Sequence, residues 1–279
     1  MKNSSIHYGT SSFSSKDWVG PFYPEGTASR DFLSYYSTQF DTVEIDATYY
    51  RIPSGSTVDG WAAKTPDSFT FAAKFPRSIV HGGEGREPNP DVILQPDATY
   101  ETRDKFLGVM SRLDEKLGPL LLQFPYLPKR VYAGRKQFFE KLDKFLTDLP
   151  DDFRYAVEIR NRNWLKPDFV ELCKKHNAAL VLADQGWMPH GDEIAKMIEP
   201  VTTDFSYIRL LGDRKKIEDI TSTWDKEVID HEDSLMRWAN LMEDLTERFR
   251  AQIYIYANNH YAGHAPATIR RLQHLIFNR

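Results

Sequence analysis

Eight short stretches of the chain alternate between large apolar residues and small or polar ones, which is the two-residue period of a β-strand. In residues 155–160, for example, the apolar side chains share one face, and the other face carries an acid and a base, Glu158 and Arg160. The pattern predicts strands at residues 6–11, 42–46, 69–75, 120–124, 155–160, 179–183, 207–211 and 253–257.

Between these stretches, apolar residues recur with the 3.6-residue period of an amphipathic helix. The predicted helices cover residues 28–39, 54–64, 100–113, 136–149, 167–176, 233–249 and the segment from about 265 onward. The longest segment without either period, residues 76–97, is predicted to be a loop. Its glycine-rich run at residues 82–85 lacks the Gly-Lys-Ser/Thr ending of a phosphate-binding loop, so it carries no nucleotide signature.

Strands and helices that alternate along the chain predict a parallel sheet covered by helices, in the α/β class. Eight such units in about 250 residues have the size of a (β/α)8 barrel. An open doubly wound sheet would carry a glycine-rich turn after its first strand, and residues 9–13, Gly-Thr-Ser-Ser-Phe, do not form one. We therefore predict a single (β/α)8 TIM-type barrel of parallel strands over residues 1–279, with a long loop at about residues 76–97.

The net charge of −4 and the pI of about 6.1 argue against a bulk electrostatic grip on nucleic acid, although they leave room for a local basic patch. The single cysteine, Cys173, excludes an intramolecular disulfide, and its place in the apolar stripe of a predicted helix indicates burial. The N-terminus lacks the apolar core of a signal peptide, and no apolar run reaches membrane length. These features predict a soluble, cytoplasmic protein that does not associate with a membrane, and they leave its oligomeric state open.

The candidate functional residues follow from the parity of the strands. In a barrel, the large apolar side chains meet the outer helices, and residues of the other parity point inward. All of the polar inward residues lie toward the carboxyl ends of their strands, where barrel enzymes place their chemistry. The sequence therefore predicts a polar site at that mouth of the barrel, built from Glu44, Lys74, Gln123, Glu158, Arg160, Arg209, Tyr256 and Asn258.

Two interpretations fit this inward set, and they are compatible. Burying an isolated charge costs on the order of several kcal/mol. Glu44 and Glu158 are therefore expected to neutralise the basic residues Lys74, Arg160 and Arg209 in a structural network. The same bases are the donors that a site for an anion would use. If both hold, the carboxylates keep the basic groups in place for a ligand.

Other candidates rest on single features. His81, just after the third strand, is either an acid–base group or an ordinary loop histidine. Asn258 and Asn259 precede the last helix, where free backbone N–H groups favour an anion, or they simply cap that helix. His260 and His264 do not form a zinc signature, because Gly263 and Pro266 interrupt a helix there. No cofactor is firmly implied, although a divalent metal held by Glu44, Glu158 and Asp184 is possible.

Several short motifs are spread over nearly the whole chain. They are Gly9–Ser11, Trp18–Pro24, Thr42–Asp46, Tyr49–Pro53, Phe71–Lys74 with His81, Leu117–Gln123, Ala156–Arg160 with Trp164, Asp184, Tyr207–Arg209 and Asn258–Pro266. With these segments the chain resembles the DUF72 family, also called YecE-like proteins. The resemblance implies a TIM-type barrel and recurrent residues that coincide with the inward set, but no reaction, because the function of the family is unknown.

The chain departs from this family pattern at two places. Ser12-Phe13 stands where the family usually has Gly-Trp, and Val80 replaces the threonine that commonly precedes the histidine. The mouth of the barrel near the first and third strands is therefore expected to differ in shape.

The first functional hypothesis is an enzyme, a hydrolase or a lyase, that acts on an anionic small molecule such as a phosphate ester or a phosphorylated sugar. Its catalytic residues would be Glu158 as general base or acid, Lys74 as a binding group or Schiff-base nucleophile, Glu44 as a tuning group, and His81. Its substrate-binding residues would be Arg160, Arg209, Gln123, Asn258, Asn259 and Asp184. The alternatives are a nucleic-acid-binding protein, such as a metal-dependent nuclease, and a non-catalytic module that binds a small molecule or a partner.

Overall fold

The computed structural model describes residues 6–277 and forms a nearly closed barrel of eight parallel strands. Each strand pairs with its neighbours in sequence from β2 to β8, and β8 also pairs with β1. This arrangement confirms the predicted (β/α)8 TIM-type barrel. The strands are β1 (Ile6–Thr10), β2 (Thr42–Ile45), β3 (Thr70–Lys74), β4 (Leu117–Gln123), β5 (Tyr155–Glu158), β6 (Ala179–Gln185), β7 (Phe205–Gly212) and β8 (Gln252–Ala257).

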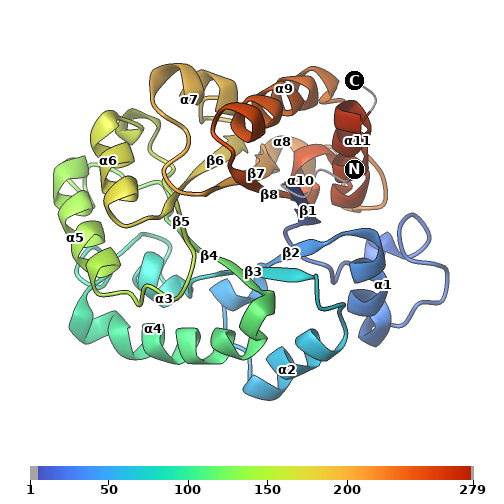
Figure 1. Cartoon of the computed structure of the whole chain (residues 1–279), viewed down its shortest axis with the longest axis horizontal. Coiled ribbons are helices and arrows are strands. Elements are labelled where there is room, and N and C mark those ends of the chain that lie inside the picture. Colours follow the sequence, from blue (N-terminus) through green and yellow to red (C-terminus); the bar gives the residue numbers. More distant parts are fainter. Residues whose placement is uncertain (1–5, 278–279) are drawn as a thin grey trace.

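Helices surround the ring of strands on its outside (Figure 1). Each predicted helix is present, with ends that differ by a few residues from the predicted ones. The helices are α1 (Phe32–Gln39), α2 (Gly55–Ala63), α3 (Arg77–Val80), α4 (Pro96–Met110), α5 (Arg135–Thr147), α6 (Pro167–Lys175), α7 (Gly191–Met197), α8 (Arg214–Glu218), α9 (Glu232–Arg248), α10 (Asn259–Ala262) and α11 (Ala265–Phe277).

Four of these helices, α3, α7, α8 and α10, were not predicted from the sequence. They have between 4 and 7 residues, which is too short to display a 3.6-residue period. Three of them begin at a side-chain cap, because His190 accepts a hydrogen bond from the Asp192 N–H, Asp213 accepts one from the Lys216 N–H and Asn258 accepts one from the His260 N–H. The first of the four, α3, lies within the predicted loop at residues 76–97, whose end is taken up by the start of α4.

The barrel is held together between β1 and β2 by a side chain. Gly9 of β1 lies so close to β2 that a Cβ atom there would stand 2.2 Å from the Thr42 carbonyl oxygen. The buried hydroxyl of Tyr36, on α1, accepts a hydrogen bond from the Thr10 N–H at 2.8 Å and donates one to the Thr42 carbonyl at 3.1 Å. This hydroxyl therefore takes the place of a direct backbone bond between the first and second strands.

We expect the substitution Tyr36→Phe to lower the free energy of unfolding by about 1–3 kcal/mol, because it leaves the Thr10 N–H and the Thr42 carbonyl buried without this partner. Denaturant unfolding measures the change. Tyr35→Phe, on the same helix but only half-buried, is the matched control and should change the free energy by less than about 0.5 kcal/mol. Equal effects of the two substitutions would contradict the bridging role of Tyr36.

The barrel wall separates two apolar layers. Outward side chains such as Val43 and Ile45 of β2 belong to the large core between the strands and the helices. Inward side chains of the other parity fill the barrel itself, and three of them, Ala72, Ala156 and Tyr207, stand two positions before a charged residue of the network. The inward cluster consists of Ala72, Leu121, Ala156, Ala179, Val181, Phe205, Tyr207, Tyr254 and Tyr256. Since Ala156 and Glu158 lie on the side opposite Val157, the predicted parity of β5 is confirmed.

The end of the barrel where the strands begin carries its own polar layer. Arg154 donates to the carboxylate of Asp204 at 2.6 Å and to the side-chain oxygen of Gln252 at 2.6 Å. His7 stacks on Tyr254, with ring centroids 4.7 Å apart. These contacts join the starts of β1, β5, β7 and β8 across that end.

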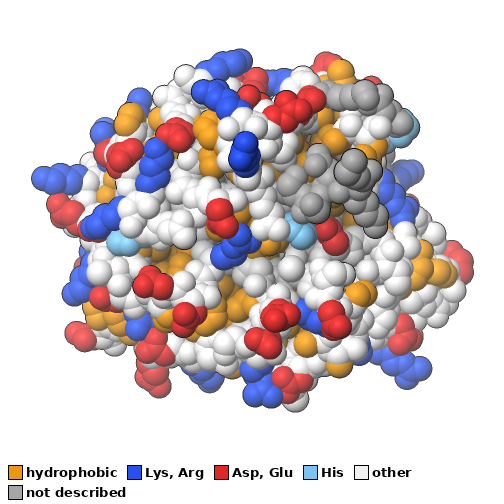
Figure 2. All heavy atoms as spheres, viewed as in Figure 1, with side chains coloured by type: hydrophobic (Ala, Val, Ile, Leu, Met, Phe, Trp, Pro, Cys, Tyr) orange, Lys and Arg blue, Asp and Glu red, His pale blue; other side chains and the backbone are white. Residues whose placement is uncertain are grey.

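The surface mixes charges of both signs. In Figure 2, acidic and basic side chains are interspersed around the face shown, and one acidic and one basic side chain lie together near its middle. On this face, neither sign of charge forms a large separate patch. Within residues 6–277, none of the helices combines the length and the apolar character that crossing a membrane requires.

Candidate functional site

The centre of the candidate site is the guanidinium group of Arg209. Its Nε and Nη2 donate to the two carboxylate oxygens of Glu44 at 2.9 and 2.8 Å, and its Nη1 donates to Glu158 Oε2 at 2.5 Å. All three residues are at most 1% exposed. A two-pronged arginine–carboxylate pair is among the strongest and most directional of hydrogen-bonded arrangements. The site therefore contains a rigid, fully buried centre.

The fold brings these residues together from strands that do not touch. Glu44 lies on β2, Glu158 on β5 and Arg209 on β7, so their side chains meet across the barrel interior. Each occupies the inward parity near the carboxyl end of its strand, as the sequence predicted. The hydroxyl of Tyr207, two residues before Arg209, adds a hydrogen bond to Glu44 Oε2 at 2.8 Å.

Two further basic groups complete the network, Arg160 at a partly exposed position and Lys74 with a side chain that is only 7% exposed. Arg160 donates through Nε to Glu158 Oε1 at 2.8 Å, and its side chain is 21% exposed. Lys74 places its amine 3.8 Å from Glu44 Oε1 and in an ion pair with Asp46, which is more exposed. Together with the central residues these make three acids and three bases, so the network as a whole is electrically balanced.

This balance controls the ionisation of the carboxyl groups. Burial alone would raise the pKa of Glu158, but the charges and hydrogen bonds of Arg209 and Arg160 outweigh burial and lower that pKa from 4.5 to about 2. Burial likewise opposes ionisation of Asp46, and Lys74, followed by Arg209 and Arg160, lowers its pKa below the ordinary value. Glu158 therefore holds two arginines in place, and its assignment as a general base or acid stays a prediction.

The matching family model, described as "Protein of unknown function DUF72", covers residues 7–278. The chain belongs to the DUF72 family. Among its curated relatives, the UPF0759 protein YunF of Bacillus subtilis is 30% identical over 149 residues, which are 53% of this chain and 49% of the relative. The UPF0759 protein YecE of Escherichia coli is 32% identical over 131 residues, which are 46% of this chain and 41% of the relative. The matched region thus spans about half of each of these relatives or less.

Solved structures of the family have the same architecture over the full length. A DUF72 family protein from Thermotoga maritima superposes with a TM-score of 0.73 at 26% identity, covering 97% of this chain and 98% of that one. A DUF72 family protein from Enterococcus faecalis reaches a TM-score of 0.68 at 20% identity, covering 99% of both chains. The second match supports the fold alone. These relatives agree with the family resemblance read from the sequence, and they assign no substrate.

The remaining predicted site residues of this DUF72 protein lie around the network. Gln123, at the end of β4, is buried beside Glu158 in the strand register. Asn258 accepts a hydrogen bond from the His260 N–H at 2.9 Å, and Asn259 accepts from the Trp18 indole N–H at 3.2 Å, so both amides help to shape the loop after β8.

His81 lies apart from the network. It follows α3, and burial and then the nearby Arg77 lower the pKa of its imidazole, so the ring is neutral at physiological pH. None of the hydrogen bonds or ion pairs among residues 6–277 joins it to Glu44 or Glu158. Its assignment as a catalytic group stays a prediction.

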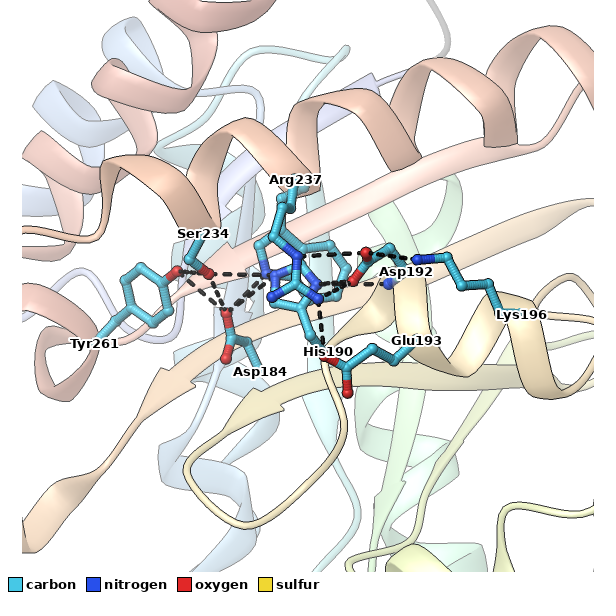
Figure 3. A network of polar contacts seen from close by, with 9 residues as sticks. Asp184, His190, Asp192, Glu193, Lys196, Ser234, Arg237 and Tyr261 are labelled. Atoms are coloured by element: carbon cyan, nitrogen blue, oxygen red, sulfur yellow. Dashed lines mark hydrogen bonds and ion pairs between the residues drawn. The ribbon is translucent and has the colours of Figure 1, made fainter.

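Asp184 lies on the other side of the barrel wall. It follows inward Ala183 on β6, and its Oδ2 accepts a hydrogen bond from the Trp238 indole at 2.8 Å. The same oxygen accepts from the Ser234 hydroxyl at 3.0 Å and the Tyr261 hydroxyl at 3.1 Å (Figure 3). These donors belong to α9 and α10, so Asp184 fastens two helices to β6. The structure does not bring it together with Glu44 and Glu158, as a shared metal site would require.

A string of polar groups continues outward from Asp184. His190 Nε2 is 3.2 Å from Ser234 Oγ, and His190 Nδ1 is 2.7 Å from Asp192 Oδ1, whose carboxylate also pairs with Arg237 (Figure 3). Serine, histidine and aspartate in series are the groups of a nucleophilic triad. Here the same hydroxyl is also held by Asp184 and by the Tyr261 hydroxyl at 2.9 Å, so the string ties α7, α9 and α10 together.

Two residues of the network were not among those predicted from the sequence. Asp46 follows Glu44 by two positions and Tyr207 precedes Arg209 by two, so both have the inward parity that selected the other members. The signal was therefore present in the strand pattern. Among the residues that the structure describes, no group of three or more His, Cys, Asp or Glu side chains is arranged to hold a metal ion.

Proposed function

We propose that this DUF72 protein is an enzyme that binds an anionic small molecule, of the phosphate-ester or sugar-phosphate class, at the carboxyl-end mouth of its barrel. The proposal rests on the position and contacts of Arg160. Among residues 6–277, its guanidinium is engaged through Nε with Glu158, which leaves the two terminal amino groups for a ligand at a partly exposed position. A planar guanidinium edge matches the oxygens of a phosphate or carboxylate.

The buried centre supports this role by holding Arg160 in place before a ligand arrives. Glu158 is fixed by Arg209, and Arg160 is fixed by Glu158. A donor that is already ordered loses little conformational entropy on binding, which favours affinity.

The charge balance of the network favours a small anion over a nucleic acid. Three acids offset three bases, so a ligand meets directed N–H groups instead of a broad positive field. Binding of nucleic acid depends on releasing many counterions from a positive surface. A small anion that accepts hydrogen bonds from Arg160 and Lys74 fits the mouth better.

Lys74 is the proposed reactive group. Its amine pairs with Asp46 and lies near Glu44, where it can transfer a proton; once deprotonated, it can add to a carbonyl ligand and form a Schiff base with release of water. The reaction class that follows is hydrolysis or elimination, a hydrolase or a lyase.

The substitution Arg160→Gln tests the proposal. We expect a phosphate ester at about one hundred times its dissociation constant to stabilise the wild type by about 2.7 kcal/mol in a thermal-shift measurement, and to stabilise Arg160→Gln much less. The panel contains inorganic phosphate, sugar phosphates, nucleotides and short oligonucleotides. Arg154→Gln, at the opposite end of the barrel, is the matched control and should keep the full shift. The proposal fails if no anion stabilises the wild type, or if Arg160→Gln responds as the wild type does.

A further inference from the structure

A small pocket of about 200 Å³ lies at the carboxyl ends of β1 and β8, in the loops that follow these strands. Its walls consist of hydroxyl groups, amides, an imidazole and the indole of Trp18, and none of the described residues that line it is an aspartate or a glutamate. The residues that matter for its chemistry are Ser11, Ser12, Asn258, His260 and Ala265.

Ser11 brings a buried hydroxyl that has no partner. The residue is 7% exposed, and its Oγ makes no hydrogen bond within the part of the chain that the structure describes. Burying a polar group without a partner is unfavourable, so native proteins leave few such groups and each one calls for a reason. A ligand in the pocket that Ser11 lines would supply the missing partner.

Ser12 adds a strained backbone at the same pocket. Its φ angle of +140° lies in the region that favours glycine, and a non-glycine residue is held there only when the surrounding structure demands it. The Ser12 hydroxyl accepts a hydrogen bond from the Ser14 N–H at 3.2 Å and lies 3.1 Å from the Ser14 hydroxyl. Glycine would adopt this φ angle without strain. The presence of a serine here therefore indicates a role for its hydroxyl group.

The electrostatic setting of the pocket suits an anion. Ala265, which lines the pocket, is the first residue of the 13-residue helix α11. The N-terminus of a helix carries a partial positive charge and favours oxyanions. The Asn259 side-chain oxygen already accepts the Ala265 N–H at 3.0 Å, so the start of this helix is fixed in place.

The pocket and the ion-pair network both lie at the carboxyl-end mouth of the barrel. Burial and Arg214 lower the pKa of His260, a wall residue, while the charges of Glu218 and Asp46 act in the opposite direction. The His260 ring itself lies 2.6 Å from Asn258 Oδ1 and 3.4 Å from Glu218 Oε1. A ligand that extends from the pocket toward the barrel axis would pass from His260 to the basic groups of the network.

We propose that this pocket binds the phosphoryl group of the ligand, with the hydroxyls of Ser11 and Ser12 as donors and the start of α11 as the source of positive potential. Arg160 and Lys74 then contact the remainder of the same molecule. The inference rests on the proposed function and adds the place where the tetrahedral oxyanion is held.

The substitutions Ser11→Ala and Ser12→Gly test this assignment, because the structure gives each serine an unusual feature that the substitution removes. Ser11→Ala removes an unpaired buried hydroxyl and Ser12→Gly removes backbone strain, so the free protein is expected to unfold at the same temperature as the wild type or at a higher one. Each is expected to weaken binding of glycerol 3-phosphate by at least about tenfold in isothermal titration calorimetry, since each loses a hydrogen bond to a charged group. Ser34→Ala, on the exposed side of α1, is the control and should leave both properties unchanged.

Glycerol and inorganic phosphate serve as the companion probes. Inorganic phosphate should bind with the same dependence on Ser11 and Ser12, and glycerol should bind far more weakly than glycerol 3-phosphate. Glycerol binding as tight as that of its phosphate would overturn the phosphoryl assignment in favour of a neutral polyol. Destabilisation of the free protein by both serine substitutions would show a structural role and would also overturn it.

The experiment separates the failure of this inference from the failure of the proposed function. If Arg160→Gln abolishes binding of glycerol 3-phosphate while Ser11→Ala and Ser12→Gly bind it normally, the anion site stands and the phosphoryl group lies elsewhere. If neither glycerol 3-phosphate nor inorganic phosphate binds the wild type, and no other anion stabilises it, both are refuted.

Discussion

Replacing Arg209 with methionine is expected to lower the free energy of unfolding by about 3–5 kcal/mol, the usual cost of breaking a buried ion pair by removing one partner. The guanidinium is the shared partner of Glu44 and Glu158, and all three side chains are at most 1% exposed. Methionine fills much of the volume but supplies no donor, so two carboxylates would remain buried without their central cation. Chemical denaturation of the two proteins measures the difference.

The control for this substitution is Arg154→Met, at the end of the barrel where the strands begin. Arg154 is also paired with an aspartate, but its side chain is 36% exposed and Asp204 is 67% exposed. Surface pairs of this kind contribute about 1 kcal/mol or less. A loss of stability for Arg209→Met no larger than that for Arg154→Met would contradict the network. Adding Glu44→Gln and Glu158→Gln to Arg209→Met should recover part of the loss, because no uncompensated charge then stays inside.

The second large effect is a dependence of stability on pH through Glu158. Its pKa falls from 4.5 to about 2 on folding, because Arg209 and Arg160 outweigh the effect of burial. A group whose pKa is depressed in the folded state stabilises that state above the unfolded pKa, and the contribution disappears as pH falls through the folded pKa. We therefore expect a contribution of about 3 kcal/mol that is fully present above about pH 5 and is lost between about pH 5 and pH 2.

The measurement is the slope of the free energy of unfolding against pH between about 5 and 3. The wild type takes up more protons on unfolding than Glu158→Gln does, by about a quarter of a proton at pH 5 and nearly one at pH 3, so the slope of the variant should be smaller by that amount. Glu84→Gln, at a side chain that is 94% exposed, is the control and should keep the wild-type slope. Identical slopes for the wild type and Glu158→Gln would show that the two arginines do not lower the pKa of Glu158.

These two predictions assign different tasks to neighbouring arginines. All three guanidinium nitrogens of Arg209 donate to two buried carboxylates, so Arg209 stabilises the fold. Arg160 binds Glu158 through Nε, and its two terminal amino groups remain at a partly exposed position. A substrate screen based on an Arg209 variant would therefore confuse loss of fold with loss of binding. Arg160 and the serines of the small pocket are the positions where binding can be changed while the fold is kept.

The strand pattern predicted most of the network because parity is a local property of the backbone. Alternating side chains lie on opposite faces of a strand, so the position of Val157 in the outer core places Glu158 inside. Once eight parallel strands are inferred, their carboxyl ends must meet at one mouth. The same rule applied consistently would also have included Asp46 and Tyr207.

Asp184 shows where this reasoning stopped working. It is a polar residue at the carboxyl end of a strand, as Glu44 and Glu158 are, but it has the outward parity and is bonded to Trp238 of α9 and Tyr261 of α10. Its partners lie 54 and 77 residues away in sequence. No local pattern records which distant helix will cover a given strand, so the role of Asp184 became visible only in the folded chain.

The sequence by itself determined the barrel, the order of its strands and the polar character of its carboxyl-end mouth, because these follow from periodicity and from the alternation of strands and helices. Only the tertiary structure decided which charges pair, that Tyr36 bridges the first two strands, and that an unpaired Ser11 hydroxyl and a strained Ser12 face one pocket. The physical reason is that pairing, burial and strain depend on distances between residues far apart in the chain. Those distances are fixed by the packing of all the elements together.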